Sequence, residues 1–256
     1  IDSAKSGAAY AGYHGALQDL FGVDQVPRKG PPLIAIPTTA GTGSEVTNVA
    51  ILSDKVAQLK KGIVSDYLLP DVALISPQMT LTCPRSVTAA SGVDALVHAI
   101  ESYLSLNASP ITDALAIGAI KLIVNALPKA YANPANLQAR DDMATASLMA
   151  GMAFGNAGVG AVHALAYPLG GRYNVGHGVS NSLLLPYVMH WNKLACVERM
   201  RDIAEAMGVD VAGLSVTEAA DRAVDAMTRL CADVEIPSGL RNFGVTEDAI
   251  PAMAAE

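Results

Sequence analysis

The sequence lacks the features that mark several classes of protein. Its three cysteines are far apart and form no CxxC pair, which argues against a disulfide framework or a thiolate metal site and favours a reducing cytoplasm. It has no run of basic residues and a net charge of −7, so nucleic acid is not expected as a partner. It also has no signal peptide and no initiator Met, and we take it as a piece of a longer protein.

One long stretch without charge raises the question of a membrane segment. Residues Met143 to Gly171 contain no Asp, Glu, Lys or Arg, which is long enough to cross a bilayer. The stretch is rich in Gly and Ala, however, and it contains Asn156 and His163. Small residues let helices pack closely, so we predict a pair of buried helices and no membrane partner.

The character of the sequence changes near residue 80. A predicted helix at Asp2–Gly22 comes first, followed by the apolar, β-rich runs PPLIAIP, TNVAIL and DVALIS. The first and last runs are continuous rather than alternating, which is typical of parallel strands covered on both faces. After Pro84, long segments rich in Ala, Leu and Met predict helices, among them Leu137–Gly151. We therefore predict two domains, an α/β domain at residues 1–80 and a helical domain at residues 81–256.

The segment GVDALVHAIES, from Gly92 to Ser102, places polar groups on an otherwise apolar helix. Asp94 and His98 are four residues apart and share one helix face. His163 and His177 lie in similarly apolar or glycine-rich surroundings. A buried carboxylate is costly unless it is paired or binds a metal, and three imidazoles with one carboxylate suit Fe(II) or Zn(II) rather than calcium or magnesium. The alternative is an Asp94–His98 ion pair with the other two histidines elsewhere.

The loop IPTTAGTGSEVT, from Ile36 to Thr47, is a second candidate site. Its backbone N–H groups and Thr hydroxyls can hold phosphate or ribose oxygens, although such a loop can equally be a plain turn. It contains no GK[ST] and is not a P-loop, and it lacks the further spaced glycine of a dinucleotide fingerprint.

These motifs together resemble the iron-containing (group III) alcohol dehydrogenase family. The matching segments are DSAK, IPTTAGTGSEVT, LLPDVALISP, GVDALVHAIESY, AFGNAGVGAVHALAYPLGG and GHGVSNSLLLPYV. The resemblance implies a partial, Rossmann-like dinucleotide-binding α/β domain followed by an all-α domain, a dehydroquinate synthase-like architecture with the site between the two. It further implies a cytoplasmic, NAD- or NADP-dependent enzyme, a homodimer or larger homo-oligomer, that transfers a hydride reversibly between a small alcohol and its aldehyde or ketone.

The same resemblance assigns residues to the site. The implied metal ligands, for Fe(II) or Zn(II), are Asp94, His98, His163 and His177. The residues expected along the cofactor are Thr38, Thr39, Thr42, Val49 and Lys60. Lys61 is an alternative to Lys60, and Phe154 is expected to line the substrate pocket.

Two departures from the family pattern affect this prediction. Tyr167 stands where many members have a histidine near the nicotinamide, and a tyrosine does not titrate near neutrality, so we keep Tyr167 as a provisional catalytic residue. The family's glycine-rich GGGS precedes its DxAK segment, so the residues that select NAD or NADP lie outside this sequence.

The motifs are also compatible with other functions. A hydroxyacid–oxoacid transhydrogenase shares the motifs, a maleylacetate reductase generally lacks the full ligand set, and glycerol-type enzymes use a different ligand pattern. The chain taken alone is also compatible with a metal-binding module that has no activity.

Overall fold

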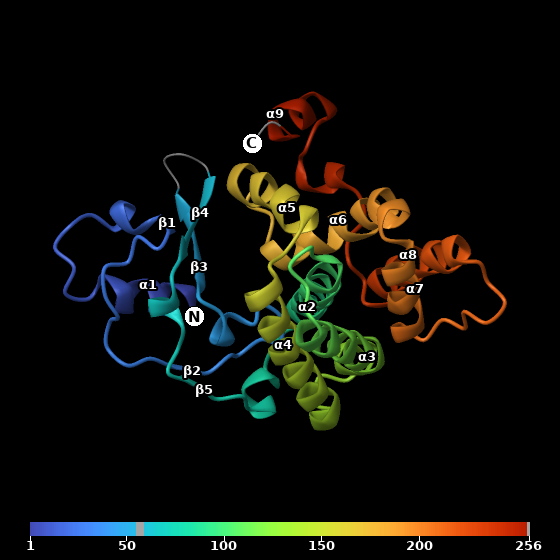
Figure 1. The fold of residues 1–256 in the computed structure, drawn as a ribbon, viewed down its shortest axis with the longest axis horizontal. Coiled ribbons are helices and arrows are strands. Elements are labelled where there is room, and N and C mark those ends of the chain that lie inside the picture. Colours follow the sequence, from blue (N-terminus) through green and yellow to red (C-terminus); the bar gives the residue numbers. More distant parts are fainter. Residues whose placement is uncertain (55–58, 255–256) are drawn as a thin grey trace.

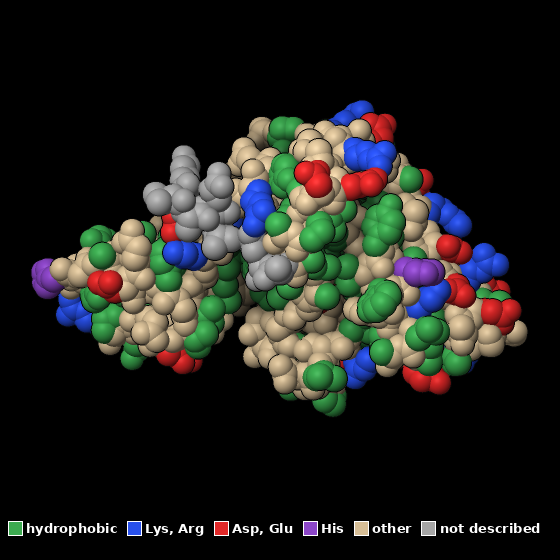
Figure 2. Space-filling model, turned by 90° about the horizontal axis from the view of Figure 1, so that it is seen from above, with side chains coloured by type: hydrophobic (Ala, Val, Ile, Leu, Met, Phe, Trp, Pro, Cys, Tyr) green, Lys and Arg blue, Asp and Glu red, His purple; other side chains and the backbone are tan. Residues whose placement is uncertain are grey.

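All described strands lie in the first third of the chain, beside a larger body of helices (Figure 1). The computed structural model describes residues 1–54 and 59–254. In space-filling view the first part is a narrower lobe next to the broad helical body (Figure 2). The predicted class, a partial α/β region followed by helices, is confirmed.

The described residues of the α/β part form two small sheets, one α-helix and several short 3-10 turns. The bounds of the helix and strands are α1 Asp2–Tyr10, β1 Gly22–Val23, β2 Ile34–Ala35, β3 Val49–Asp54, β4 Leu59–Val64 and β5 Val72–Ala73. Strands β2 and β5 pair in parallel, as the continuous apolar runs predicted. The other sheet has the order β1-β4-β3, with β4 parallel to β1 and antiparallel to β3.

The helical part begins directly after Pro84. Its helices are α2 Arg85–Leu104, α3 Pro110–Ala132, α4 Leu137–Ala157, α5 Ala161–Arg172, α6 His177–Asn192, α7 Val197–Ala206, α8 Val216–Asp233 and α9 Ile250–Ala254. Side-chain caps fix several starts: Ser109 accepts from the Thr112 N–H at α3, and Ser215 forms a reciprocal box with Glu218 at α8. The domain boundary near residue 80 stays a prediction.

Helix α2 is the centre of the helical body, in contact with α3, α4 and α6. Val93, Leu96, Val97 and Ile100 are completely buried, because neighbouring helices cover α2 on several sides. Such a position removes the polar face that an ordinary surface helix keeps. Every polar side chain in the middle of α2 therefore needs a buried partner or a ligand.

Two predicted helix bounds are wrong. The first helix ends at Tyr10 instead of Gly22, since Gly12 follows with a φ of +74° that a helix cannot contain. Helix α4 continues past Gly151 to Ala157. Gly151 does not end the helix. The backbone of Gly43 lies so close to it that a Cβ atom on Gly151 would be 2.8 Å from Cα of Gly43.

The uncharged stretch from Met143 to Gly171 forms parts of α4 and α5, which meet at an angle of 103°. This bend confirms the predicted pair of helices. Helix α3 is the one described helix that is long and apolar enough by itself to cross a membrane. The core helix of a globular protein passes the same test, and α3 packs against both α2 and α4.

Candidate metal centre

Helices α2, α5 and α6 bring four side chains to one point. The candidate ligand atoms of Asp94, His98, His163 and His177 all lie within 4.8 Å of one another. The Asp94 Oδ1 atom is 3.9 Å from Nε2 of His163 and 3.8 Å from Nε2 of His177. The alternative of an Asp94–His98 pair with distant histidines does not describe this geometry.

His98 and His163 are held from behind, on the ring atoms that face away from the cluster. Nδ1 of His98 is 3.3 Å from the Gly41 carbonyl, and the Phe154 ring stacks on the imidazole with centroids 4.2 Å apart. Nδ1 of His163 is 2.6 Å from Oε2 of Glu101. Nε2 of His163 is buried and has no hydrogen-bond partner among the described residues.

Asn181 supports the carboxylate. Its Nδ2 donates to Asp94 Oδ1 at 2.6 Å and lies 3.2 Å from Nε2 of His177, one helical turn earlier on α6. The Oδ1 atom of Asn181 has no hydrogen-bond partner among the described residues. A divalent cation would give the bare His163 nitrogen a partner, and three nitrogens with one oxygen suit Fe(II) or Zn(II), so these residues fit such an ion.

Burial sets the protonation of the cluster. It lowers the pKa of His98 to about 3 and also lowers the pKa of His177, so both imidazoles are neutral near pH 7. Burial by itself raises the pKa of Asp94, but the three neighbouring histidines and the Asn181 amide bring it below its usual value. A neutral imidazole and an ionised carboxylate are the forms that bind a metal.

The threonine- and glycine-rich loop packs directly on the helical part. A Cβ atom on Gly41 would lie 2.6 Å from Cβ of Ser91, and one on Gly43 would lie 2.5 Å from Cα of Gly151. Only glycine permits this approach of backbones. Thr38 and Thr42 remain exposed and Thr39 is half-buried, so their side chains are accessible to a ligand.

Helix α1 holds the far end of this loop through a buried lysine. Lys5 is completely buried, and its Nζ donates to the Thr47 carbonyl at 2.7 Å and to the Val49 carbonyl at 3.0 Å. Asp2, one turn earlier, accepts a hydrogen bond from the Ser44 hydroxyl. The DSAK segment and the loop therefore form one hydrogen-bonded unit.

This arrangement predicts a stability that rises in mild alkali. Burial lowers the pKa of Lys5 from 10.5 to about 8, and the charges of Asp2 and Glu45 oppose this only in part. Between those pH values the unfolded chain binds more protons than the folded one, so the free energy of unfolding increases with pH. We expect this contribution to reach about 3 kcal/mol, since one pKa unit corresponds to about 1.4 kcal/mol.

The measurement is chemical denaturation across that pH range for the wild type and for Lys5→Met. The wild type should gain stability relative to the variant as the pH rises from about 8 to about 10.5. A stability difference that does not depend on pH would contradict the prediction.

The two candidate lysines of β4 point in opposite directions, as successive strand residues do. Lys60 faces α5, where a Cβ on Gly170 would be 3.2 Å from its Nζ, and the charge of Asp94 acts on it. Lys61 pairs with Asp54 at 2.8 Å and lies over the Phe21 ring. The geometry thus favours Lys60 over Lys61 as the lysine near the cluster.

Tyr167 is half-buried on α5, one turn after His163. Burial and the nearby charge of Glu101 raise the pKa of its phenol. At neutral pH the side chain is therefore a protonated hydroxyl that can donate a hydrogen bond.

Sequence reasoning missed three supporting groups: Glu101, Asn181 and the carbonyl of Gly41. Glu101 had a signal, since it lies seven residues after Asp94 and so on the same face of α2. Asn181 lies four residues after His177. The carbonyl of Gly41 carries no sequence signal, because every residue has one.

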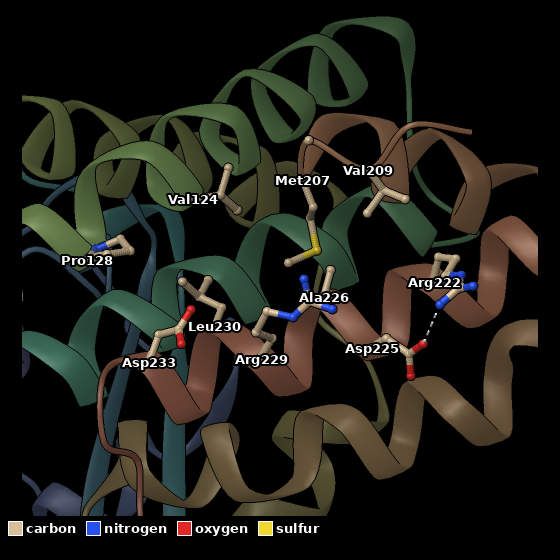
Figure 3. A pocket seen from close by; sticks show the side chains of 11 residues that line it. Val124, Pro128, Met207, Val209, Arg222, Asp225, Ala226, Arg229, Leu230 and Asp233 are labelled. Carbon is tan, nitrogen blue, oxygen red and sulfur yellow. Dashed lines mark ion pairs between the residues drawn. The ribbon is translucent and has the colours of Figure 1, made fainter. Parts of the chain in front are cut away.

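A separate cavity of about 310 Å³ lies between α3, α8 and the chain after α7 (Figure 3). It contains the Arg222–Asp225 ion pair at 3.7 Å. None of the four clustered residues lines it, so it is not part of the candidate site.

Comparisons with known proteins place this arrangement in a family of oxidoreductases. The model of the iron-containing alcohol dehydrogenase family matches residues 1–77, and the model of its C-terminal part matches residues 88–256. The chain belongs to the iron-containing alcohol dehydrogenase family, as the motifs predicted.

Individual relatives agree with this assignment. The chain is 49% identical to long-chain-alcohol dehydrogenase 1 of Geobacillus thermodenitrificans, covering all of this chain and 65% of the relative. It is 43% identical to the NAD-dependent methanol dehydrogenase of Bacillus methanolicus, covering 99% of this chain and 66% of the relative. A solved 1,3-propanediol oxidoreductase superposes with a TM-score of 0.96 at 46% identity, covering 99% of this chain and 66% of that one. The chain thus spans about two thirds of the length of these proteins.

Proposed function

We propose that this chain carries the metal centre of an NAD(P)-linked alcohol dehydrogenase. The observation that carries the proposal is the buried Nε2 of His163, which has no hydrogen-bond partner among residues 1–54 and 59–254 and lies beside an ionised carboxylate and two neutral imidazoles. In the proposed site Asp94, His98, His163 and His177 hold Fe(II) or Zn(II). When bound, such an ion is a Lewis acid that polarises the oxygen of an alcohol or carbonyl substrate.

The remaining residues bind and orient. The exposed hydroxyls of Thr38 and Thr42, with Thr39 and the backbone near Val49, are proposed to hold the cofactor, and Lys60 is proposed to neutralise its phosphates. A nicotinamide held by these residues would accept the hydride from the alcohol carbon, and the hydroxyl proton would leave to solvent. Tyr167 stays protonated, so its proposed part is a hydrogen bond to substrate or cofactor and not the storage of a proton.

The proposed substrate is a small primary alcohol or the matching aldehyde. Phe154 presents an apolar ring beside His98, which suits an alkyl chain. The relatives above are named for a long-chain alcohol, methanol and propanediol, so chain length is the variable to measure. The three cysteines are free thiols, which fits the proposed cytoplasmic location.

The test is metal analysis followed by turnover of the full-length protein. We expect about one iron or zinc per chain after anaerobic purification, and formation of reduced nicotinamide with primary alcohols and NAD or NADP. Loss of turnover on chelation and its return on reloading are also expected. A folded protein that takes up no metal, or that oxidises no alcohol when loaded, would refute the proposal. Turnover only with a 2-oxoacid and no free cofactor would identify a transhydrogenase instead.

A further inference from the structure

We propose that Glu101 is a positioning residue for the metal centre: it fixes His163 in the one tautomer that can bind the ion and ties that ligand to the start of α5. This inference rests on the proposed function, because it concerns how the same centre is held. Glu101 is one of the buried carboxylates of the helical part, only 3% exposed. It is not a ligand candidate, since it lies behind His163.

Both oxygens of the Glu101 carboxylate are used. Oε2 is 2.6 Å from Nδ1 of His163, and Oε1 accepts from the Val162 N–H at 2.7 Å. A carboxylate oxygen accepts hydrogen bonds, so this contact selects the tautomer of His163 in which Nδ1 carries the proton and Nε2 is bare. The other tautomer would place a lone pair against Oε2 and aim an Nε2 proton at Asp94 Oδ1, which is 3.9 Å away and too far for a hydrogen bond. The carboxylate therefore presents the correct nitrogen before any ion binds.

The local fold is built around this contact. Asp94, His98 and Glu101 follow one face of α2, so a single stripe supplies two candidate ligands and the outer partner of a third. The chain leading into α5 passes so close that a Cβ on Gly160 would lie 2.9 Å from Oε1. The Val162 N–H is one of the orphan donors of the first turn of α5. Glu101 thus joins the position of α5 to the position of the ligand.

The direct test is the metal affinity of Glu101→Gln. Glutamine keeps the size but cannot accept from both Nδ1 of His163 and the Val162 N–H. We expect the dissociation constant for Zn(II), measured by competition with a chelator, to rise about 10- to 100-fold, the usual cost of losing an outer partner. The matched control is Asp202→Asn. Asp202 lies on α7 and accepts a hydrogen bond from the hydroxyl of Tyr103, which is on the same helix as Glu101. This variant should leave the affinity within about twofold of the wild type.

Two backgrounds separate positioning from a general effect on folding. If Glu101 acts through His163, Glu101→Gln should change affinity by less than about twofold when His163→Asn is already present. In the His177→Asn background it should still cost the full 10- to 100-fold. An equal loss in both backgrounds would overturn the proposal, because Glu101 would then act on the helices in general.

A measurement on the metal-free wild type needs no variant. Nitrogen NMR of the histidine side chains should show His163 with a proton on Nδ1 and none on Nε2. A proton on Nε2, or an unchanged affinity in folded Glu101→Gln, would overturn the inference while a wild type that binds metal leaves the proposed function intact. A wild type that binds no metal would refute both.

Discussion

Asp94→Asn is expected to abolish tight metal binding while leaving the fold intact. The substitution keeps the size of the side chain and removes the single carboxylate of the cluster. Asp94 is 1% exposed, so solvent does not compensate for the lost negative charge, and only the three imidazoles remain as candidate ligands. Loss of an outer partner costs about 10- to 100-fold in affinity, and loss of a ligand should exceed this.

Stability provides a second readout for the same variant. An ion present at about 1,000 times its dissociation constant stabilises a folded protein by about 4 kcal/mol. We expect this metal-dependent rise in melting temperature in the wild type and none in Asp94→Asn. The metal-free forms should melt within a few degrees of each other, because Asn181 retains a polar partner.

The chain offers matched controls for this experiment. His14 and His190 are exposed and lie outside the cluster, so His14→Asn and His190→Asn should keep one metal per chain. Stoichiometric metal in Asp94→Asn at wild-type affinity would contradict the prediction and would mean that Asp94 is not a metal ligand.

The sequence singled out the four clustered residues on two grounds, polar groups in apolar or glycine-rich surroundings and the resemblance to a known family. Asp94 and His98 are polar groups at helical spacing on a helix whose other residues are apolar, and burial of such groups needs a reason. The continuous apolar runs correctly predicted parallel strands, but the expected cover on both faces is not found among the described residues, because Ile34 of β2 is 61% exposed and Val72 of β5 is 47% exposed. That the four residues serve as metal ligands stays a prediction.

What the sequence could not predict depends on contacts between distant segments. Strand β4 contains Lys60, Lys61 and Gly62, a composition that is not typical of a central strand, yet it pairs on both sides. Gly151 resembled a helix end, and only the position of Gly43 shows why α4 continues through it. In both cases a tertiary contact overrides the local preference.

Gly151→Ala should destabilise the protein, although alanine is favoured over glycine in a helix by about 1 kcal/mol. The new Cβ would lie 2.8 Å from Cα of Gly43 and 2.9 Å from Cγ2 of Val46. The backbone of Gly43 cannot rotate away as a side chain can, so the loop would have to move away from α4 to make room for the new Cβ atom. Overpacking of this kind typically costs about 1–3 kcal/mol, and we expect the net change in free energy of unfolding to be unfavourable.

Gly155 on the same helix provides the control. A Cβ there would meet its nearest neighbour, Cγ2 of Thr47, at 3.4 Å, which is ordinary contact. Gly155→Ala should therefore leave the stability unchanged or raise it by up to about 1 kcal/mol. Equal stabilities for the two variants in denaturant unfolding would show that the close approach at Gly151 does not limit the fold.

Gly151→Ala should also weaken metal binding, although Gly151 contacts none of the candidate ligands. The loop that packs against Gly151 contains Gly41, whose carbonyl is 3.3 Å from Nδ1 of His98. Displacing the loop removes this partner, so the dissociation constant for Zn(II) should rise about 10-fold or more in Gly151→Ala and stay at the wild-type value in Gly155→Ala. An unchanged affinity in a destabilised Gly151→Ala would mean that the Gly41 carbonyl is not needed to hold His98. The predicted loss follows because the loop proposed to hold the nucleotide also holds a ligand of the metal.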